Sequence, residues 1–428
     1  MAIAFRALRL LCSSSDELIN DGVVVVRDRK IDNVGPWRTI QPSLPRDVTV
    51  RDLGDVTLMP GLFDCHVHLQ MDPSKINTST AITLTDDELL PLMQTNALRL
   101  LDAGVTTARD LGSRGITAVH LRDKIKAGEV PGPRLQCANA PLTVAGGHCH
   151  AMGGVCEGVE GVREEVRKRA AEGADLIKVM STGGFMTAGS HPSQARFTQE
   201  EMNAIKDEAR KFNLPVTAHA MGIEGIERVA NANFDTVEHC AWINREGRAV
   251  FDADVARKLL DNNIAVCPTM NSACIEKHYF CPWDKRAVVV DNWVSLRKAN
   301  IKIFMGTDSG IGLCRFERYA DGLTVMADAG YTNRELIAAA TDVAAEVCGL
   351  AGETGKLEPG LAADLVAFAG NPLEDLNAFF APKFVMASGR EHKLTPIEPI
   401  GDNAEAGALT VKLLKQGAGL QEDIPIQR

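Results

Sequence analysis

Short apolar strand segments alternate with amphipathic helices through the middle of the chain, and this rhythm is the strongest constraint on its fold. The strand segments are a run ending at His68 and then residues 105–109, 134–137, 176–180, 215–219, 236–239, 264–269 and 301–308. Amphipathic patterns separate them, for example at 92–103, 159–172, 199–212, 223–232 and 252–261. This alternation is typical of a parallel α/β fold. Eight such units over about three hundred residues predict a (β/α)8 barrel of the TIM type.

Both ends of the chain have a sequence pattern that differs from that of the middle. Residues 5–58 and the segments 363–368 and 384–389 are rich in β-branched residues and closely spaced turns, which predicts strands. We expect the two ends to meet in one discontinuous β-sandwich domain of residues 1–58 and 357–428, and the barrel to span residues 59–356. The N-terminal stretch carries Arg6 and Arg9 among its apolar residues, so we interpret it as a strand of the mature fold and not as a secretion signal.

The composition excludes several classes of protein. The apolar fraction of 45% and the charged fraction of 24% are ordinary for a globular protein. The net charge of -10 argues against a nucleic-acid binder, and no apolar run reaches the roughly 18 residues of a membrane span. The 11 cysteines have no CxxC spacing, which predicts reduced thiols in a cytoplasmic protein.

The first barrel strand ends in His66-Val67-His68. Alternate side chains of a strand share a face, so the two imidazoles point the same way. Neutral imidazole suits zinc and similar metals, and the pair therefore has the pattern of half a metal site. A pair of polar residues satisfied by hydrogen bonds is the alternative interpretation, and partners further along the chain decide between the two.

Such partners occur where the other predicted strands end. Barrel enzymes carry their chemistry at the carboxyl ends of the strands. The residues at those ends are His66, His68, Lys178, His219, His239 and Asp308. We therefore expect these six side chains to converge on one site.

Lys178 is the unusual member of this set, because its neighbours Ile177 and Val179 are apolar and a buried ammonium is costly. One interpretation is a lysine with a depressed pKa that acts as a base or forms a Schiff base. The other is a lysine whose amine has reacted with carbon dioxide. The resulting carbamate is a two-oxygen anion that can bridge two metal ions.

The chain resembles the amidohydrolase superfamily, and within it the branch of Xaa-Pro dipeptidase-like, imidazolonepropionase-like and ochratoxin-hydrolysing enzymes. The motifs that carry the resemblance are MPGLFDCHVH at 59–68, GVTTARD at 104–110, GPR at 132–134, GGH at 146–148, LIKVMSTGG at 176–184, AHA at 218–220, VEH at 237–239, GTD at 306–308 and GLAADL at 360–365. They extend over nearly the whole chain, and they are specific for the superfamily but not for a substrate.

The resemblance implies a site with two divalent ions, for which zinc is the favoured metal. His66, His68 and Asp308 would hold one ion, His219 and His239 the other, and carboxylated Lys178 and a hydroxide would bridge them. The hydroxide would attack the scissile carbonyl, and Asp308 would act first as general base and then as general acid. The resemblance also implies a small-molecule amide or peptide substrate and a homo-oligomer.

Further residues are candidates for contact with the substrate. We predict His148 as a second catalytic residue that holds a substrate oxygen, and His150, Phe185, Met186 and Met221 as substrate-binding residues. Peptide-cleaving relatives often carry a tyrosine where this chain has Met221. Other predictions are less direct: Arg196 and Lys277 either bind a substrate carboxylate or are solvated surface charges, Arg109 and Asp110 brace the barrel mouth, and residues 70–83 form a lid.

The main functional hypothesis is a metal-dependent hydrolase of an amide or peptide C–N bond, with an N-acyl amino acid, an Xaa-Pro-like dipeptide or an ochratoxin-like aryl amide as substrate. A deaminase or a lactone, carbamate or phosphotriester hydrolase is the alternative on the same scaffold. Deaminases of this fold usually have a Glu near the fifth-strand His and lack the fourth-strand Lys, unlike this chain. A catalytically silent barrel that serves as an assembly or binding protein is the alternative from another class.

Overall fold

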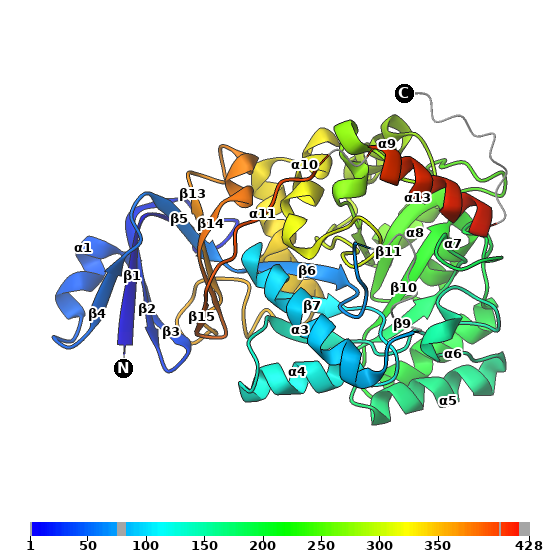
Figure 1. Cartoon of the computed structure of the whole chain (residues 1–428), viewed down its shortest axis with the longest axis horizontal. Helices are drawn as coiled ribbons and strands as arrows, with labels where there is room; N and C mark the ends of the chain where they lie inside the picture. Colours follow the sequence, from blue (N-terminus) through cyan, green and yellow to red (C-terminus); the bar gives the residue numbers. More distant parts are fainter. Residues whose placement is uncertain (1, 75–82, 402–403, 419–428) are drawn as a thin grey trace.

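The computed structural model describes residues 2–74, 83–401 and 404–418, and Figure 1 shows them as a sheet at one end joined to a larger α/β body. Residues 75–82, which form most of the predicted lid, lie outside these ranges. All eleven cysteines are free, in agreement with the prediction of reduced thiols. No helix within the described ranges is both long enough and apolar enough to span a bilayer.

The strands are β1 (Ala2–Leu10), β2 (Ile19–Arg27), β3 (Lys30–Pro36), β4 (Thr49–Asp52), β5 (Val56–Pro60), β6 (Leu62–Val67), β7 (Val105–Asp110), β8 (Arg134–Cys137), β9 (Ile177–Met180), β10 (Val216–Gly222), β11 (Thr236–Ile243), β12 (Ala265–Cys267), β13 (Leu365–Ala369), β14 (Pro382–Ala387) and β15 (Arg390–His392). The α-helices are α1 (Trp37–Ile40), α3 (Asp86–Asp102), α4 (Thr117–Ala127), α5 (Gly158–Ala171), α6 (Gln199–Arg210), α7 (Ile223–Asn231), α8 (Ala253–Asp261), α9 (Arg286–Lys298), α10 (Ala320–Asp328), α11 (Asn333–Ala340), α12 (Asp342–Val347) and α13 (Ala404–Gly417). Short 3-10 turns are η1 (Gln41–Ser43), η2 (His150–Met152), η3 (Ser272–Cys274), η4 (Glu276–His278), η5 (Phe316–Arg318) and η6 (Leu376–Phe380).

Strands from both ends of the chain share one sheet of eight strands, in the order β15-β14-β13-β5-β1-β2-β3, with β4 paired to β1. The junction between the two ends is the antiparallel pair of β5 and β13, in which Pro60 lies opposite Leu365. Alternate residues of β2 face different apolar clusters: Val24 belongs to one and Val25 to the other. This is the period of two that a strand requires when both of its faces are covered.

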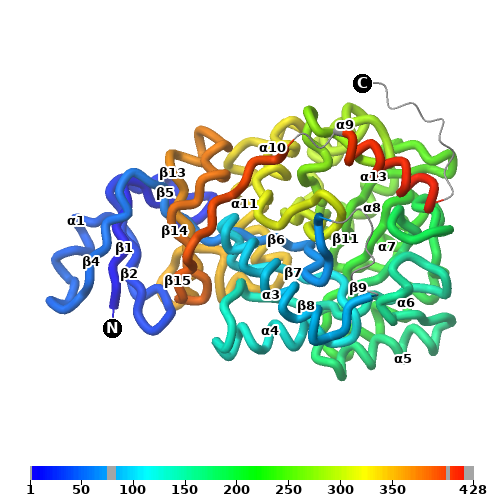
Figure 2. The backbone as a smooth tube through the Cα atoms, in the orientation of Figure 1, coloured from blue at the N-terminus to red at the C-terminus, as the bar shows by residue number. Residues whose placement is uncertain are grey.

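The strands of the α/β body form two parallel sheets, β6-β7-β8 and β12-β11-β10-β9. A parallel bridge between Leu142 and Val179 connects the chain after β8 to β9. Helices α3 to α8 lie outside these strands, as the tube in Figure 2 shows. The body therefore has a TIM-barrel-like α/β fold, and its strands begin and end within a few residues of the predicted segments.

The eighth predicted strand segment, 301–308, is not a regular strand. It is connected to β12 by a bridge between Val266 and Ile303, and to β6 by a hydrogen bond from Cys65 N to Met305 O of 2.9 Å. A Cβ atom at Gly306 would lie 2.6 Å from the Cys267 sulfur and 2.8 Å from the His66 nitrogen. The backbone is thus packed too closely for any side chain there, and a glycine is required at this position.

Three helices begin with the same sequence motif. Thr85, Thr198 and Thr332 each precede a helix whose third residue is a glutamate, and threonine and glutamate cap each other's backbone N–H groups. This capping box satisfies donors that the first turn of a helix leaves free. The helices α3, α6 and α11 therefore have starting points fixed by local sequence.

The C-terminal helix α13 lies at the opposite end of the molecule from β1–β4 (Figures 1 and 2). Its Leu414 packs in one cluster with Phe185 and Met221 of the α/β body. Gly189 N donates a hydrogen bond of 2.6 Å to Gly417 O. This part of the range 357–428 therefore lies against the α/β body and not against the sheet of the predicted terminal domain, because the apolar partners of the helix are there.

The buried carboxylate of Glu208 connects α6 to α5. It accepts hydrogen bonds from Lys211 at 2.7 Å, Arg167 at 2.8 Å and Arg163 at 3.1 Å. These bonds, that of Lys211 first, lower the pKa of Glu208 to about 2. A carboxylate with a lowered pKa stabilises the fold at a pH above its unfolded pKa of about 4.3, and the stabilisation is lost as the pH falls toward 2.

We expect Glu208→Gln to lower the free energy of unfolding by about 1.5–3 kcal/mol at neutral pH, because charged hydrogen bonds are lost. The difference from the unaltered protein should shrink as the pH falls below about 4. Urea unfolding at a series of pH values measures both effects. The control Asp207→Asn removes a surface partner of Arg210 on the same helix and should change little. A difference for Glu208→Gln that does not depend on pH would contradict this assignment.

Candidate functional site

The six residues predicted to converge do lie together. His66, His68, Lys178, His219, His239 and Asp308 all line one cavity of about 100 Å³ at the carboxyl ends of the strands. β6 carries His66 and leads directly into His68, while β9, β10 and β11 carry the lysine and the other two histidines. The lysine and the histidines are buried. Because parallel strands end at the same edge, residues far apart in the sequence meet here.

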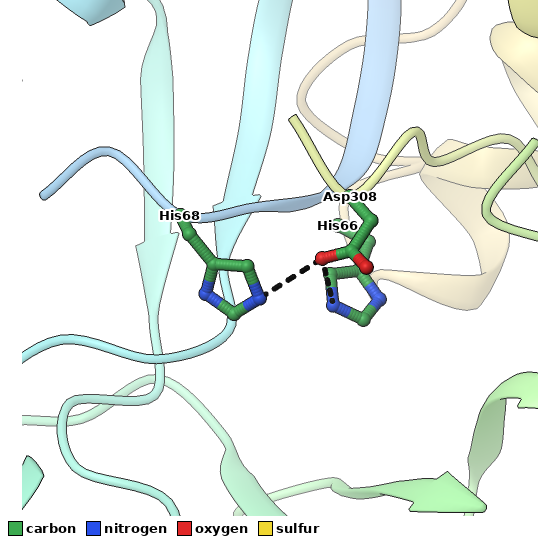
Figure 3. Close-up of side chains that lie close together, drawn as sticks. All are labelled: His66, His68 and Asp308. Carbon is green, nitrogen blue, oxygen red and sulfur yellow. Dashed lines mark ion pairs between the residues drawn. The ribbon is translucent and has the colours of Figure 1, made fainter. Parts of the chain in front are cut away.

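His66, His68 and Asp308 form the first cluster (Figure 3). The Asp308 Oδ1 atom lies 3.1 Å from His68 Nε2 and 3.4 Å from His66 Nε2. One ligand atom from each residue lies within 4.8 Å of the others, a spacing that can hold a metal ion. Two imidazoles and one carboxylate are a ligand set that zinc accepts.

His219 and His239 form the second cluster, with ring centroids 4.5 Å apart. The ring of His66 lies 5.0 Å from that of His239, so the two clusters adjoin. His148 extends the row, with its ring 4.7 Å from that of His219. The imidazoles of the cavity therefore form a continuous row.

One nitrogen of each of the four histidines in the two clusters is occupied by the protein. The contacts are His66 Nδ1 with Glu238 Oε2 at 2.9 Å, His68 Nδ1 with Gly112 O at 3.3 Å, His219 Nε2 with Gly183 O at 2.9 Å and His239 Nδ1 with Thr269 Oγ1 at 2.9 Å. Such contacts fix the orientation and tautomer of a metal-binding imidazole. They leave the other nitrogen of each ring for a ligand.

The protonation states suit this role. Burial, followed by the neighbouring positive charges, lowers the pKa of His66, His219 and His239 well below the ordinary histidine value. These rings are therefore neutral near pH 7, as metal binding requires. Burial also acts on the pKa of His68, but the hydrogen bond and charge of Asp308 outweigh it and raise that pKa.

Lys178 is the strongest sign that the protein alone does not complete the site. Its side chain is 1% exposed, and its Nζ atom has no hydrogen-bond partner. Burial lowers the pKa of Lys178 from the ordinary lysine value. A buried amine with a lowered pKa gives up its proton more readily than an ordinary lysine, and the neutral amine can react with carbon dioxide; the carbamate would then offer oxygen ligands to the ions. The donor atoms present thus fit two divalent ions.

A second group of potential ligands, His66, Glu238 and Cys267, also lies within 4.8 Å. Its Glu238 is fully buried and already accepts hydrogen bonds from Arg109 at 2.8 Å and from Thr217 at 2.6 Å. The pair with Arg109 offsets the cost of burying this carboxylate. We therefore assign Glu238 to the support of His66 and not to a metal, and Arg109 braces the barrel mouth as predicted.

Backbone strain is concentrated at this edge. His239, Thr269 and Asp308 have left-handed φ angles of 68°, 52° and 61°. Such angles cost about 1–3 kcal/mol for a residue with a side chain. His239 lies within β11, Thr269 follows β12 and Asp308 ends the irregular segment 301–308, and all three residues line the cavity.

Not all of the predicted substrate-contacting residues lie at the cavity. His148, Phe185, Met186 and Met221 line the cavity, whereas His150 is exposed and its Nδ1 lies 3.0 Å from Gly147 O. Burial, followed by the charges of His68 and Lys178, lowers the pKa of His148 to about 3. His148 is therefore a neutral imidazole, and its buried Nδ1 has no hydrogen-bond partner.

Sequence reasoning missed several residues of the cavity wall, namely Thr269, Asn271, Phe280, Trp283, Thr410 and Leu414. Thr269 and Asn271 follow β12, at the end of the predicted strand segment 264–269. Their position at a strand end could therefore have identified them as residues of the cavity. The others come from the segment before α9 and from α13, whose patterns do not indicate where they pack. Arg196 and Lys277 are not among the residues that line the cavity.

If His219 and His239 hold an ion, we expect Thr269→Val to weaken its binding by about 10- to 100-fold, because the change removes the hydrogen bond that orients His239. Competition with a chromophoric zinc chelator measures the affinity. Thr324→Val makes the same chemical change on α10, away from the cavity, and should leave zinc affinity unaltered. Equal affinities for the two variants would refute the orienting role.

Comparison with known proteins agrees with this site. The chain is 28% identical to the ochratoxinase of Aspergillus niger, with 92% of this chain and 88% of the relative aligned. It is 22% identical to the imidazolonepropionase of Rhizobium rhizogenes, over 82% and 86% of the two chains. Solved structures of a Xaa-Pro dipeptidase with bound methionine and of the A. niger ochratoxinase each superpose with a TM-score of 0.79 at 26% identity. The first alignment covers 92% of this chain and 100% of the other, and the second covers 94% and 98%.

These relatives come from the branches that the sequence motifs indicated. The family described as "Amidohydrolase family" matches residues 57–391, which include all six converging residues. Its members named above are enzymes, and the match extends over most of the chain. The chain therefore belongs to the amidohydrolase family and is a hydrolase that acts on C–N bonds.

Proposed function

We propose that this protein is a metal-dependent hydrolase with a binuclear site, and that it cleaves an amide or peptide C–N bond in a small molecule. The substrate class comprises N-acyl amino acids, Xaa-Pro-like dipeptides and aryl amides of the ochratoxin type. The observation that carries the proposal is the unpartnered amine of Lys178, which lines the same cavity as two histidine clusters.

His66, His68 and Asp308 would hold one ion, His219 and His239 the second, and Lys178, after carboxylation, both. Two divalent ions, of which zinc best suits the imidazole donors, would activate a water molecule and polarise the scissile carbonyl. The histidine contacts to Glu238, Gly112, Gly183 and Thr269 hold the rings in place before any ion arrives. This preorganisation reduces the ordering that binding requires.

The protein contributes the proton transfers. Asp308 is 14% exposed and faces the cavity, so it can accept a proton from the attacking water and deliver it to the leaving nitrogen. Amide nitrogen is a poor leaving group until it is protonated, so this delivery is needed. Neutral His148 can hold a substrate oxygen through a ring nitrogen.

Further proposals concern the domain boundary, the oligomeric state and the location of the protein. We place the boundary between a β-sandwich-like terminal domain and the barrel near residues 58 and 357. We also keep the prediction of a homo-oligomer in the cytoplasm, which sedimentation of the purified protein and localisation of a tagged chain can test.

A hydrolysis screen tests the activity. Protein loaded with zinc in the presence of bicarbonate is incubated with N-acyl amino acids, dipeptides and aryl amides, and free amine is measured. We expect about two ions per chain and turnover of at least one amide class. A protein with two ions that releases ammonia only from amidine-type substrates would support the deaminase alternative, and a protein that binds no metal would support the silent barrel.

We expect Lys178→Ala to lower metal content to below one ion per chain and to reduce kcat/KM by about 10²–10³-fold or more, since metal ions supply several kcal/mol of transition-state stabilisation. Added propionate, a two-oxygen anion that fits the space of the lost side chain, should restore part of both. Metal analysis and kinetics give the two readouts.

The matched control is Lys206→Ala. Lys206 is also a buried lysine, but it pairs with Asp235 outside the cavity. This variant should keep its metal content. A fully active, fully loaded Lys178→Ala variant would exclude a bridging role for the lysine.

A further inference from the structure

Helix α13 supplies part of the cavity wall from outside the region that matches the family. The family match ends at residue 391, whereas α13 begins at Ala404. Nevertheless Thr410 and Leu414 line the same cavity as the six converging residues. Features of the cavity that come from α13 therefore lie outside the matched family region.

Several independent contacts hold α13 in this position. Leu414 and Ala418 pack in one apolar cluster with Phe185 and Trp283, and Val411 belongs to the main core. The hydrogen bond from Gly189 N to Gly417 O fixes the last turn of the helix.

The helix backbone also approaches the cavity wall closely. A Cβ atom at Gly407 would lie 2.9 Å from Phe280 Cβ, so the first turns of α13 rest directly on the wall at Phe280. The glycine permits this close approach.

The wall beneath α13 is apolar and aromatic. Its apolar and aromatic residues include Phe185, Met221, Phe280, Trp283 and Ile311, to which α13 adds Leu414. The rings of Phe185 and Trp283 are stacked, with centroids 6.3 Å apart and planes 30° from parallel. An aromatic wall of this kind favours a flat apolar group, and its ring faces offer contact area without a requirement for charge.

The described residues that line the cavity include few cationic side chains that could pair with a substrate carboxylate. Of the described residues that line it, Lys178 is the one lysine or arginine, and carboxylation would turn it into an anion. A carboxylate placed in this cavity away from the proposed metal ions would lose its hydration without gaining a lysine or arginine partner from these lining residues, which is unfavourable.

On the basis of the proposed function, we propose that α13 completes a pocket for an uncharged aromatic group, so that the enzyme prefers neutral aryl-bearing amides to amides that stand beside a carboxylate. Within the proposed substrate class, N-acyl amino acids and dipeptides are then poor substrates. Leu414 is the specificity-determining residue on α13, and it acts by closing the pocket over the bound ring.

Two compounds that differ by one carboxylate test the preference. N-benzoylphenethylamine is N-benzoylphenylalanine without its carboxylate. We expect the neutral compound to have at least a ten-fold lower Kd, by calorimetry with the zinc-loaded protein, and at least a ten-fold higher kcat/KM. Equal or reversed affinities would overturn the inference.

A charge placed on α13 tests the role of the helix. Leu414→Arg puts a cation into the pocket and should shift the ratio of the two Kd values at least ten-fold toward the carboxylate compound. Leu413→Arg makes the same change on the solvent side of the helix, where Leu413 is 46% exposed, and should leave the ratio unaltered. Unchanged ratios for both variants would exclude α13 from the pocket.

The binding and kinetic measurements distinguish a failure of the pocket from a failure of the proposed hydrolase activity. A protein that binds the neutral compound more tightly but hydrolyses no amide when two ions are bound would refute the proposed function and leave the pocket intact. A protein that hydrolyses N-benzoylphenylalanine faster than the neutral compound would refute the pocket and keep the hydrolase.

Discussion

The carboxylate of Glu238 connects strands that belong to two different sheets of the α/β body. From β11 it accepts hydrogen bonds from Arg109 on β7 and Thr217 on β10, and it contacts His66 on β6. Removal of one partner from a buried ion pair typically costs about 3–5 kcal/mol, because a charge is left without compensation. Arg109 in turn donates to the carbonyl of Cys65, beside His66. One buried charge pair thus holds the strand ends together and orients a histidine of the candidate site.

The site itself contains buried polar atoms that the chain does not satisfy. The amine of Lys178 and one ring nitrogen of His148 have no hydrogen-bond partner, although both are buried. Three backbone positions around them are held in left-handed conformations. Unsatisfied and strained groups destabilise a fold, and they persist where the surrounding packing is strong enough to hold them. At this cavity such groups adjoin two histidine clusters, an arrangement that an external ligand would complete, and the family match agrees with that interpretation.

The strand ends could be predicted from the sequence because the periodicity of a strand and the geometry of parallel strands are local rules. These rules predict that His219 and His239 lie in the cavity, and they identify Lys178 by its apolar neighbours. They were less informative where tertiary contacts decide. Segment 301–308 is irregular and packs closely against its neighbours at Gly306, and His150 is exposed at the start of the 3-10 turn η2. The position of α13 depends on apolar partners that lie far away in the sequence, so no local pattern could reveal it.

The pairing of β5 with β13 has a consequence for folding during synthesis on the ribosome. Pro60 and Leu365, which lie opposite each other in the sheet, are roughly 300 residues apart. At a synthesis rate of roughly 5–20 residues per second, the edge of β5 that pairs with β13 remains unpaired for about 15–60 s. An unpaired strand edge is a template for association with other chains. The nascent chain therefore passes through a period in which chaperone binding, and not final stability, determines whether it reaches its native state.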